Sequence, residues 1–149
     1  MNARYRLAPM REARARNERV RQGDLSGAVG DAQVHAAAVE AATRRVEEAR
    51  AALAGANHAR DRALTAAARG GVPVATLAHL ERYIARLRHA LDAALGERSR
   101  AQALHRGQLE IVDAARERLA RARAERELVE RHFAAWRAER RKLAERRED

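Results

Sequence analysis

The residues that could do chemistry are few, and their spacing supports no catalytic site. Six histidines are scattered along the 149 residues: His35, His58, His79, His89, His105 and His132. None lies four residues from another, the helical spacing that brings two imidazole nitrogens to one metal ion. The two serines, Ser26 and Ser99, have no base at a recognisable spacing, and the chain has neither a glycine-rich phosphate loop nor a cysteine. We therefore expect a non-enzymatic protein without a bound metal ion or cofactor.

The composition favours long helices over a globular core. The chain contains 38 alanines and 30 arginines but only four aromatic residues. Methyl side chains bury too little area to fill a thick core, whereas alanine and arginine both have high helix propensity. The apolar runs are far shorter than the ~20 residues that span a bilayer, and no N-terminal signal pattern occurs. The sequence therefore predicts a cytoplasmic protein without direct membrane insertion.

The strongest break in the helical pattern is Arg69–Pro73, a segment with a tandem glycine followed by a proline. Glycine commonly ends a helix, and proline fits the first turn of the next one. We predict a single domain over residues 1–149, with one helix over about 6–68, a turn at about 69–73 and a second helix over about 74–146. Because short connections join antiparallel neighbours, the predicted fold is all-α, with two long helices forming an antiparallel coiled-coil hairpin.

Alternating steps of three and four residues define the predicted contact between the helices, which we call the seam. In the first helix the steps select Leu25, Val29, Ala32, Ala36, Val39, Thr43, Val46, Arg50, Leu53, Asn57, Arg60, Leu64 and Ala67. In the second they select Leu77, Leu80, Ile84, Leu87, Leu91, Ala94, Arg98, Ala101, His105, Gln108, Val112, Ala115, Leu119, Ala122, Arg126, Val129, Phe133, Trp136, Arg140 and Leu143. Most are apolar, and so long a repeat predicts helices supercoiled around each other.

Six seam residues carry specific expectations: Leu7, Met10, His105, Gln108, Phe133 and Trp136. If the chain turns near Gly71, Leu7 and Met10 approach Trp136 and Phe133, so the largest side chains meet near the termini. The two polar residues are interpreted as a layer that fixes the helix register, with a metal or proton-switch role as the alternative.

Three glycines weaken the first predicted helix within residues 22–30. Each costs ~1 kcal/mol relative to alanine in a helix. Two interpretations remain open. The helix is either weak but continuous, held by its partner helix, or it contains a hinge that lets residues 1–22 move independently.

Positive charge is concentrated near both termini. The formal net charge is +10, of which residues 1–22 carry +5, residues 116–149 carry +4 and residues 23–115 carry +1. A pI near 11.4 permits binding to nucleic-acid phosphates. However, glutamates interrupt the arginine stripe, so nucleic acid is disfavoured as a partner. A solvated helix face and docking into an acidic protein socket are the other two interpretations.

Tyr83 follows the predicted turn and lies beside the seam. It either covers the edge of the seam or is an exposed aromatic anchor, a residue type enriched at binding hot spots. The sequence leaves both interpretations open.

Five features carry a family resemblance: the chain length, Tyr5–Glu12 followed by an arginine-rich helix, the midpoint glycine pair, Leu77–Leu91 with its central Tyr-Ile, and a charged C-terminal segment with Trp136. Together they resemble the YscO/FliJ family, the central stalk proteins of type III secretion systems and flagellar export machines. The tryptophan near the C-terminus favours the virulence or symbiosis branch over the flagellar one.

The resemblance implies a stalk at the cytoplasmic face of the inner-membrane secretion apparatus. Its partners would be a hexameric secretion ATPase, whose activity it stimulates or couples, the cytoplasmic ring protein of the export gate, and chaperones of exported proteins. The resemblance assigns the export-gate contact to Leu80, Tyr83, Ile84 and Leu87. Charge and position assign the ATPase contact to Arg11, Arg14, Arg140 and Arg141.

Two other functions remain as alternatives. One is a basic coiled-coil protein that binds nucleic acid. The other is a self-assembling scaffold in which each chain forms one long helix and the hairpin does not close.

Overall fold

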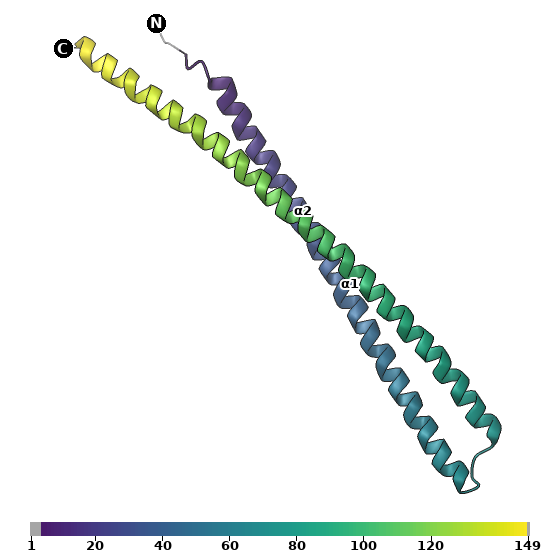
Figure 1. Ribbon diagram of the computed structural model, residues 1–149. Helices are drawn as coiled ribbons and strands as arrows, with labels where there is room; N and C mark the ends of the chain where they lie inside the picture. The colour runs from purple at the N-terminus through teal and green to yellow at the C-terminus, as the bar shows by residue number, and fades with distance from the viewer. Residues whose placement is uncertain (1–3, 149) are drawn as a thin grey trace. The chain divides into compact units, whose positions relative to one another are not determined.

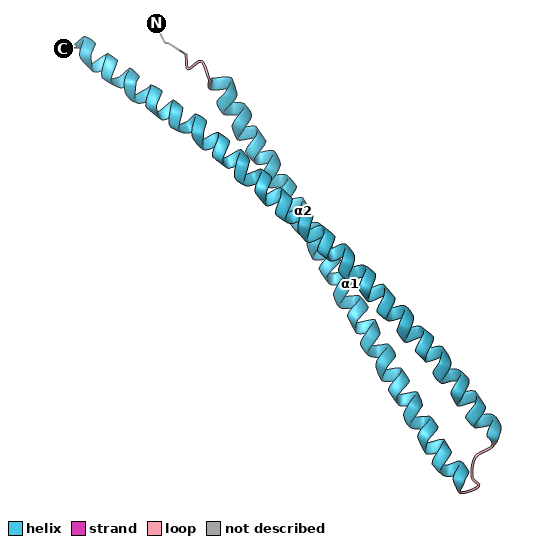
Figure 2. Cartoon of the chain, viewed as in Figure 1, coloured by secondary structure: helices cyan, strands magenta, loops and turns pink. Residues whose placement is uncertain are grey.

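The computed structural model describes residues 4–148 and consists of two long helices joined by a turn (Figure 1 and Figure 2). Helix α1 comprises Ala8–Ala68, and helix α2 comprises Val74–Glu148. No strand occurs within residues 4–148. The predicted all-α hairpin of two long helices is therefore confirmed. No helix in the described part of the chain combines the length and the apolar character needed to cross a bilayer.

The turn between the helices is built by the glycine pair. Gly70 has a φ of +82°, a left-handed conformation that glycine adopts without steric cost. Its amide donates to the Ala67 carbonyl at 2.9 Å, and the Gly71 amide donates to the Ala66 carbonyl at 3.0 Å. These two hydrogen bonds form a Schellman motif, which satisfies carbonyls left free where a helix ends. Pro73 directly precedes α2, so the segment ends one helix and starts the next.

The chain divides into two compact units. The terminal unit comprises the described residues of Met1–Ala32 and Gln108–Asp149, and the turn unit comprises Gln33–Gly107. Each unit pairs a stretch of α1 with a stretch of α2.

Small side chains form most of the core of the turn unit. The buried residues are Ala42, Val46, Ala56, Ile84 and Ala94, of which Val46 and Ile84 are fully buried. Two ion pairs join the helices at the surface, Arg45 with Glu97 at 3.4 Å and Arg60 with Glu81 at 3.8 Å. Arg45, the earlier of the two arginines in α1, pairs with Glu97, the later of the two glutamates in α2. The two helices therefore run antiparallel.

Part of the predicted α1 seam is displaced by one residue. Ala42 and Ala56 are buried where the repeat predicts Thr43 and Asn57. Of the other predicted seam positions, Arg50 is exposed and Leu64 is 49% exposed. In an alanine-rich helix two neighbouring rows satisfy the same repeat. The row that contains alanines faces α2, because the alternative row would place the larger side chains of Arg50 and Leu64 between closely packed helices.

The core of the terminal unit follows the predicted α2 seam. Ala28, Ala32, Val112 and Ala115 form a buried cluster, against which Leu25 and Val29 pack. Farther along α2, the buried residues are Leu119, Ala122 and Val129. The three-glycine segment within residues 22–30 is helical throughout, as the continuous-helix interpretation requires.

We predict that Gly70→Ala destabilises the protein by about 1–2 kcal/mol, because an L-residue pays this cost in the left-handed conformation. The matched control is Gly55→Ala, since Gly55 lies inside α1 with no atom within 4 Å of the added Cβ. The control should be neutral or stabilising by up to ~1 kcal/mol. Urea unfolding followed by circular dichroism measures both changes. Equal midpoints for the two variants would contradict the role assigned to the turn.

Candidate partner-binding surfaces

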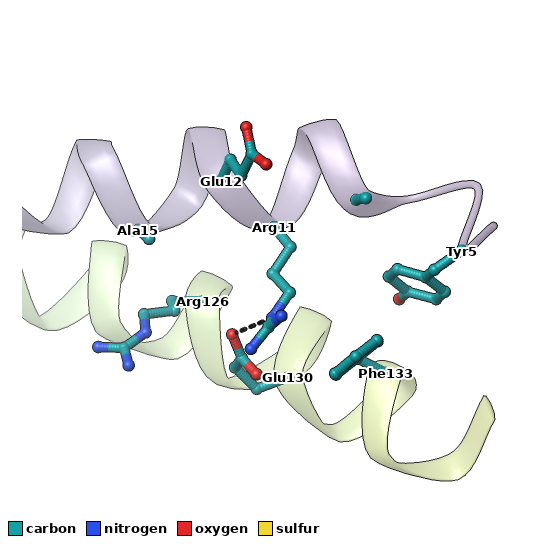
Figure 3. A pocket seen from close by; sticks show the side chains of 8 residues that line it. Tyr5, Arg11, Glu12, Ala15, Arg126, Glu130 and Phe133 are labelled. Carbon is teal, nitrogen blue, oxygen red and sulfur yellow. Dashed lines mark hydrogen bonds and ion pairs between the residues drawn. The ribbon is translucent and has the colours of Figure 1, made fainter. Parts of the chain in front are cut away.

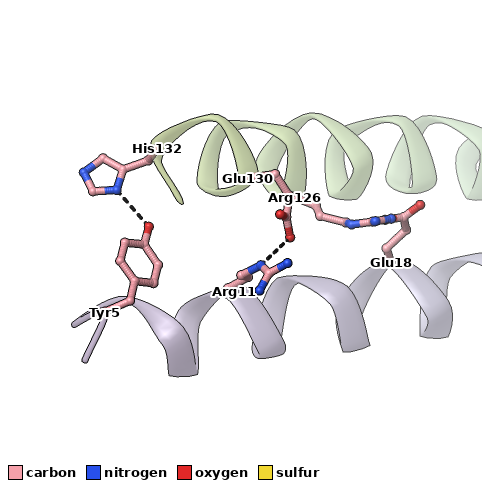
Figure 4. Close-up of polar contacts among 6 residues, drawn as sticks. All are labelled: Tyr5, Arg11, Glu18, Arg126, Glu130 and His132. Carbon is pink, nitrogen blue, oxygen red and sulfur yellow. Dashed lines mark hydrogen bonds and ion pairs between the residues drawn. The ribbon is translucent and has the colours of Figure 1, made fainter. Parts of the chain in front are cut away.

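An aromatic cluster lies where the N-terminal segment meets α2 in the terminal unit. Tyr5 precedes α1 and is only 8% exposed. Its hydroxyl and the Nδ1 of His132 form a 2.8 Å hydrogen bond, drawn in Figure 4. Its ring lies edge-on to Phe133, with centroids 4.9 Å apart, and tilted against Trp136 at 5.2 Å. These spacings are typical of favourable aromatic pairs, so the segment before α1 is held against α2.

Tyr5, rather than Met10, makes the aromatic contact that the repeat predicts near the termini. Leu7 is half-buried as expected, but Met10 is 46% exposed and its assignment to the seam is wrong. The reason is local: α1 begins only at Ala8, whose amide donates to the Tyr5 carbonyl at 3.1 Å. From that start, the row of α1 that faces α2 contains the half-buried Arg11, Arg14 and Glu18, and Met10 lies one residue away from it. No periodic pattern in the sequence predicted this contact, because Tyr5 lies before the first helix.

Charged residues occupy the seam next to this cluster. The Arg11 Nε donates to Glu130 at 2.7 Å, and its guanidinium lies 4.3 Å from the centroid of the Phe133 ring. One turn farther along α1, Arg14 pairs with Glu125. Figure 3 shows the Arg11 side chain reaching across to α2. Two of the four arginines assigned to the ATPase contact, Arg11 and Arg14, are therefore already paired with carboxylates of α2.

Glu18 forms the most enclosed of these pairs. Its side chain is 15% exposed and accepts from Arg126 at 2.7 Å, with Arg123 at 3.6 Å. Figure 4 shows Arg126 extending towards Glu18. Arg126 occupies a predicted seam position, yet it is exposed. A cross-helix ion pair thus stands where the repeat predicts apolar packing.

These contacts favour the charged forms of the groups involved. The hydrogen bond from Arg11 lowers the pKa of Glu130 below its ordinary value, and the same bond raises the pKa of Arg11. The hydrogen bond to Glu18 likewise raises the pKa of Arg126. The shifts of Arg11, Glu130 and Arg126 all favour the charged form, so their pairs act as electrostatic contacts between the helices.

A pocket of about 440 Å³ opens between the aromatic cluster and the ion pairs (Figure 3). Its lining residues are Tyr5, Ala8, Arg11, Glu12, Ala15, Arg126, Glu130 and Phe133. The wall thus combines aromatic faces with charges of both signs. Such a surface suits a protein side chain better than a small apolar ligand.

The other two arginines assigned to the ATPase contact lie near the end of α2. Arg140 and Arg141 are exposed and form no ion pair with the side chains described for residues 4–147. They differ in this respect from Arg11 and Arg14. Among the described side chains, two of the four arginines pair with a carboxylate and two do not, and all four belong to the terminal unit.

In the turn unit, the four residues assigned to the export gate differ in exposure. Ile84 is fully buried and is a core residue, so it is inaccessible to a partner while the helices are paired. Leu80 and Leu87 are half-buried in the seam. Tyr83 is 41% exposed, and the Arg86 guanidinium lies 5.8 Å from its ring centroid. Tyr83 is therefore the member of the set that can anchor a partner.

The two residues predicted as a polar layer belong to different units. His105 is half-buried in the turn unit. Gln108 is half-buried in the terminal unit, where its Nε2 donates to the Ala28 carbonyl at 3.2 Å. Among the residues described, no group of three or more His, Asp or Glu side chains is placed to hold a metal ion.

Comparison of the chain with known proteins returns no match among family models, curated proteins or solved structures.

We predict that Glu130→Gln lowers the thermal unfolding midpoint at pH 7 and lowers it less at pH 3. A carboxylate whose pKa is lowered by folding adds stability above its unfolded pKa of ~4.3, and loses it as the pH falls through the folded pKa. Circular dichroism at the two pH values measures the effect.

The matched control is Glu40→Gln, which removes an exposed carboxylate that takes part in none of the described ion pairs. Its effect should be small at both pH values. A Glu130→Gln effect that persists undiminished at pH 3 would show that the carboxylate charge is not what stabilises the pair.

Proposed function

We propose that this protein is a non-enzymatic coiled-coil stalk component of a type III secretion system, and that it links the hexameric export ATPase to the cytoplasmic ring of the export gate. The observation that carries the proposal is the division of the hairpin into two differently equipped units. The terminal unit carries the basic segments and the aromatic cluster. The turn unit carries a net charge of +5 that is spread along both of its helical stretches, and it presents the exposed Tyr83. One molecule thus offers two unlike binding surfaces.

The two end segments of the terminal unit suit an acidic protein socket. Residues 1–22 and 116–149 carry +9 of the net charge of +10, and charge of one sign speeds encounter with an oppositely charged partner. Arg140 and Arg141 are exposed on α2 and contribute to the attraction. In the proposed assembly this unit contacts the ATPase, and the protein lies at the cytoplasmic face of the inner membrane.

The turn unit suits a smaller, more apolar contact. Tyr83 is exposed beside the half-buried Leu80 and Leu87, and Val74 is 80% exposed at the start of α2. Aromatic and aliphatic side chains grouped in this way are common at the centres of protein interfaces. In the proposed assembly this surface contacts the export gate. Secretion chaperones are further proposed partners, for which no residue is assigned.

Nucleic-acid binding is the second candidate, since the pI is near 11.4. The ion pairs argue against it, because carboxylates neutralise several of the arginines that a phosphate backbone would need. Retention on immobilised DNA at physiological salt, with a steep loss of binding as salt rises, would favour this candidate over the stalk.

Addition of the protein to its cognate secretion ATPase should raise the rate of ATP hydrolysis at low salt. Arg140→Glu with Arg141→Glu should reduce the stimulation severalfold, because the attraction to an acidic socket is weakened. The control is Arg88→Glu with Arg100→Glu, which makes the same change in net charge on exposed residues of the turn unit. No stimulation and no association at low salt would refute the stalk role.

Tyr83→Ala should weaken binding to the export-gate ring protein by about tenfold or more, the loss typical of an aromatic hot spot. Its helix content should be unchanged, because the side chain is exposed. Leu104→Ala is the control, since Leu104 is 61% exposed in the same unit but is not part of the proposed contact. Surface plasmon resonance measures the affinities. Equal affinity for both variants would place the gate contact elsewhere.

A further inference from the structure

The two helices contribute unlike residues to the seam of the terminal unit. On α2, the buried seam residues opposite the start of α1 are the apolar Leu119, Ala122 and Val129, whereas Val112 and Ala115 pack against Ala28 and Ala32. On α1, residues 8–22 place charged side chains at the same repeat. These are Arg11, Arg14, Glu18 and Arg21, all half-buried. An apolar surface of α2 is therefore covered by a helical segment that has almost no apolar stripe of its own. We call residues 8–22 the basic cover.

The basic cover is also poorly matched to α2 in charge. Residues 8–22 carry a net charge of +3, and residues 118–132 of α2, which lie opposite them, carry +2, so like charges are brought together. The pairs made by Glu18, Glu125 and Glu130 offset this locally. These pairs are partly exposed, and exposed ion pairs contribute little net stability. The contact between the basic cover and α2 is thus weaker than the number of its ion pairs suggests.

Three glycines directly follow the basic cover. Gly23, Gly27 and Gly30 are helical, and a Cβ added to any of them would meet no atom within 4 Å. Packing therefore does not require glycine at these positions. Each glycine nevertheless weakens the helix by ~1 kcal/mol relative to alanine. The result is a weak joint in α1 between the basic cover and the residues beyond it.

We infer that the basic cover is displaceable and that the α2 surface beneath it binds an acidic amphipathic helix of another protein. An apolar stripe at heptad spacing would pack on Leu119, Ala122 and Val129 better than the charged residues of the cover do. Acidic residues flanking that stripe would take over Arg123 and Arg126, which now share Glu18. Such a helix would also remove the like-charge contact. This inference does not depend on the stalk role.

The test uses the full-length protein and a designed acidic peptide of several heptads, with leucine at the seam positions and glutamate at the flanking ones. Trp136, the only tryptophan, lies 5.2 Å from the Tyr5 ring at the end of this seam and reports displacement by its fluorescence. The peptide should bind with a change in Trp136 emission. A peptide with lysine in place of glutamate should not bind. Equal binding of both peptides, or of neither, would overturn the inference.

Strengthening the weak joint should oppose binding. Gly23→Ala with Gly27→Ala should lower the peptide affinity by roughly tenfold, because the two alanines stabilise the covered state. The matched control is Gly55→Ala with Gly96→Ala, which adds two equally unobstructed methyl groups to helices of the turn unit. The control should leave the affinity unchanged. The same affinity for both double variants would show that the cover need not move.

A covalent lock provides an independent measurement. The chain has no cysteine, so Arg11→Cys and Glu130→Cys can be joined by a short bismaleimide linker, given that the native side chains meet at 2.7 Å. The locked protein should lose peptide binding and the unlinked variant should retain it. Undiminished binding by the locked protein would overturn the inference. So would dimerisation that releases residues 8–22 without peptide, since this would assign the surface to a second copy of the chain.

Discussion

The contact between α1 and α2 has to stabilise the fold with very little apolar area per residue. Seven of the buried side chains are alanines: Ala28, Ala32, Ala42, Ala56, Ala94, Ala115 and Ala122. A buried methyl group contributes far less than a buried leucine or phenylalanine. Stability must therefore come from many small contacts repeated along the helices, together with the high helix propensity of alanine and arginine. A segment with few such contacts is correspondingly easy to release.

The two units meet this constraint differently. The turn unit places Val46 and Ile84 in fully buried positions and uses the Schellman motif to fix the return of the chain. The terminal unit has buried aliphatic residues on α2 but closes with the ring of Tyr5 and with ion pairs from Arg11 and Glu18. Polar contacts fix register and orientation more than they add stability. The polar contacts of the terminal unit therefore fix how its two helical stretches are aligned but add little to its stability.

The sequence was sufficient for the parts of the fold that depend on strong local signals. The tandem glycine and the proline predicted the turn, and the α2 repeat predicted its buried residues from Ile84 to Val129. It was insufficient where several rows of alanine satisfy one repeat, as at Ala42 and Ala56. It was also insufficient at Tyr5, which lies before α1 and outside any periodic pattern. Ion pairs between the helices, such as Arg126 with Glu18, could not be predicted either. A repeat of apolar residues does not determine which charged residues lie opposite each other.

The charged half of the seam is better suited to exchange than to permanent packing. When an apolar contact opens, its surfaces meet water and the full hydrophobic gain is lost. When a partly exposed ion pair opens, each group is solvated in return, and a new carboxylate can replace Glu18 or Glu130 at little net cost. A basic cover over an apolar surface therefore lowers the free-energy difference between the closed hairpin and a complex with an acidic helix. The specificity of that complex follows from the same charges, because a neutral or basic helix would cover the α2 seam without supplying partners for Arg123 and Arg126.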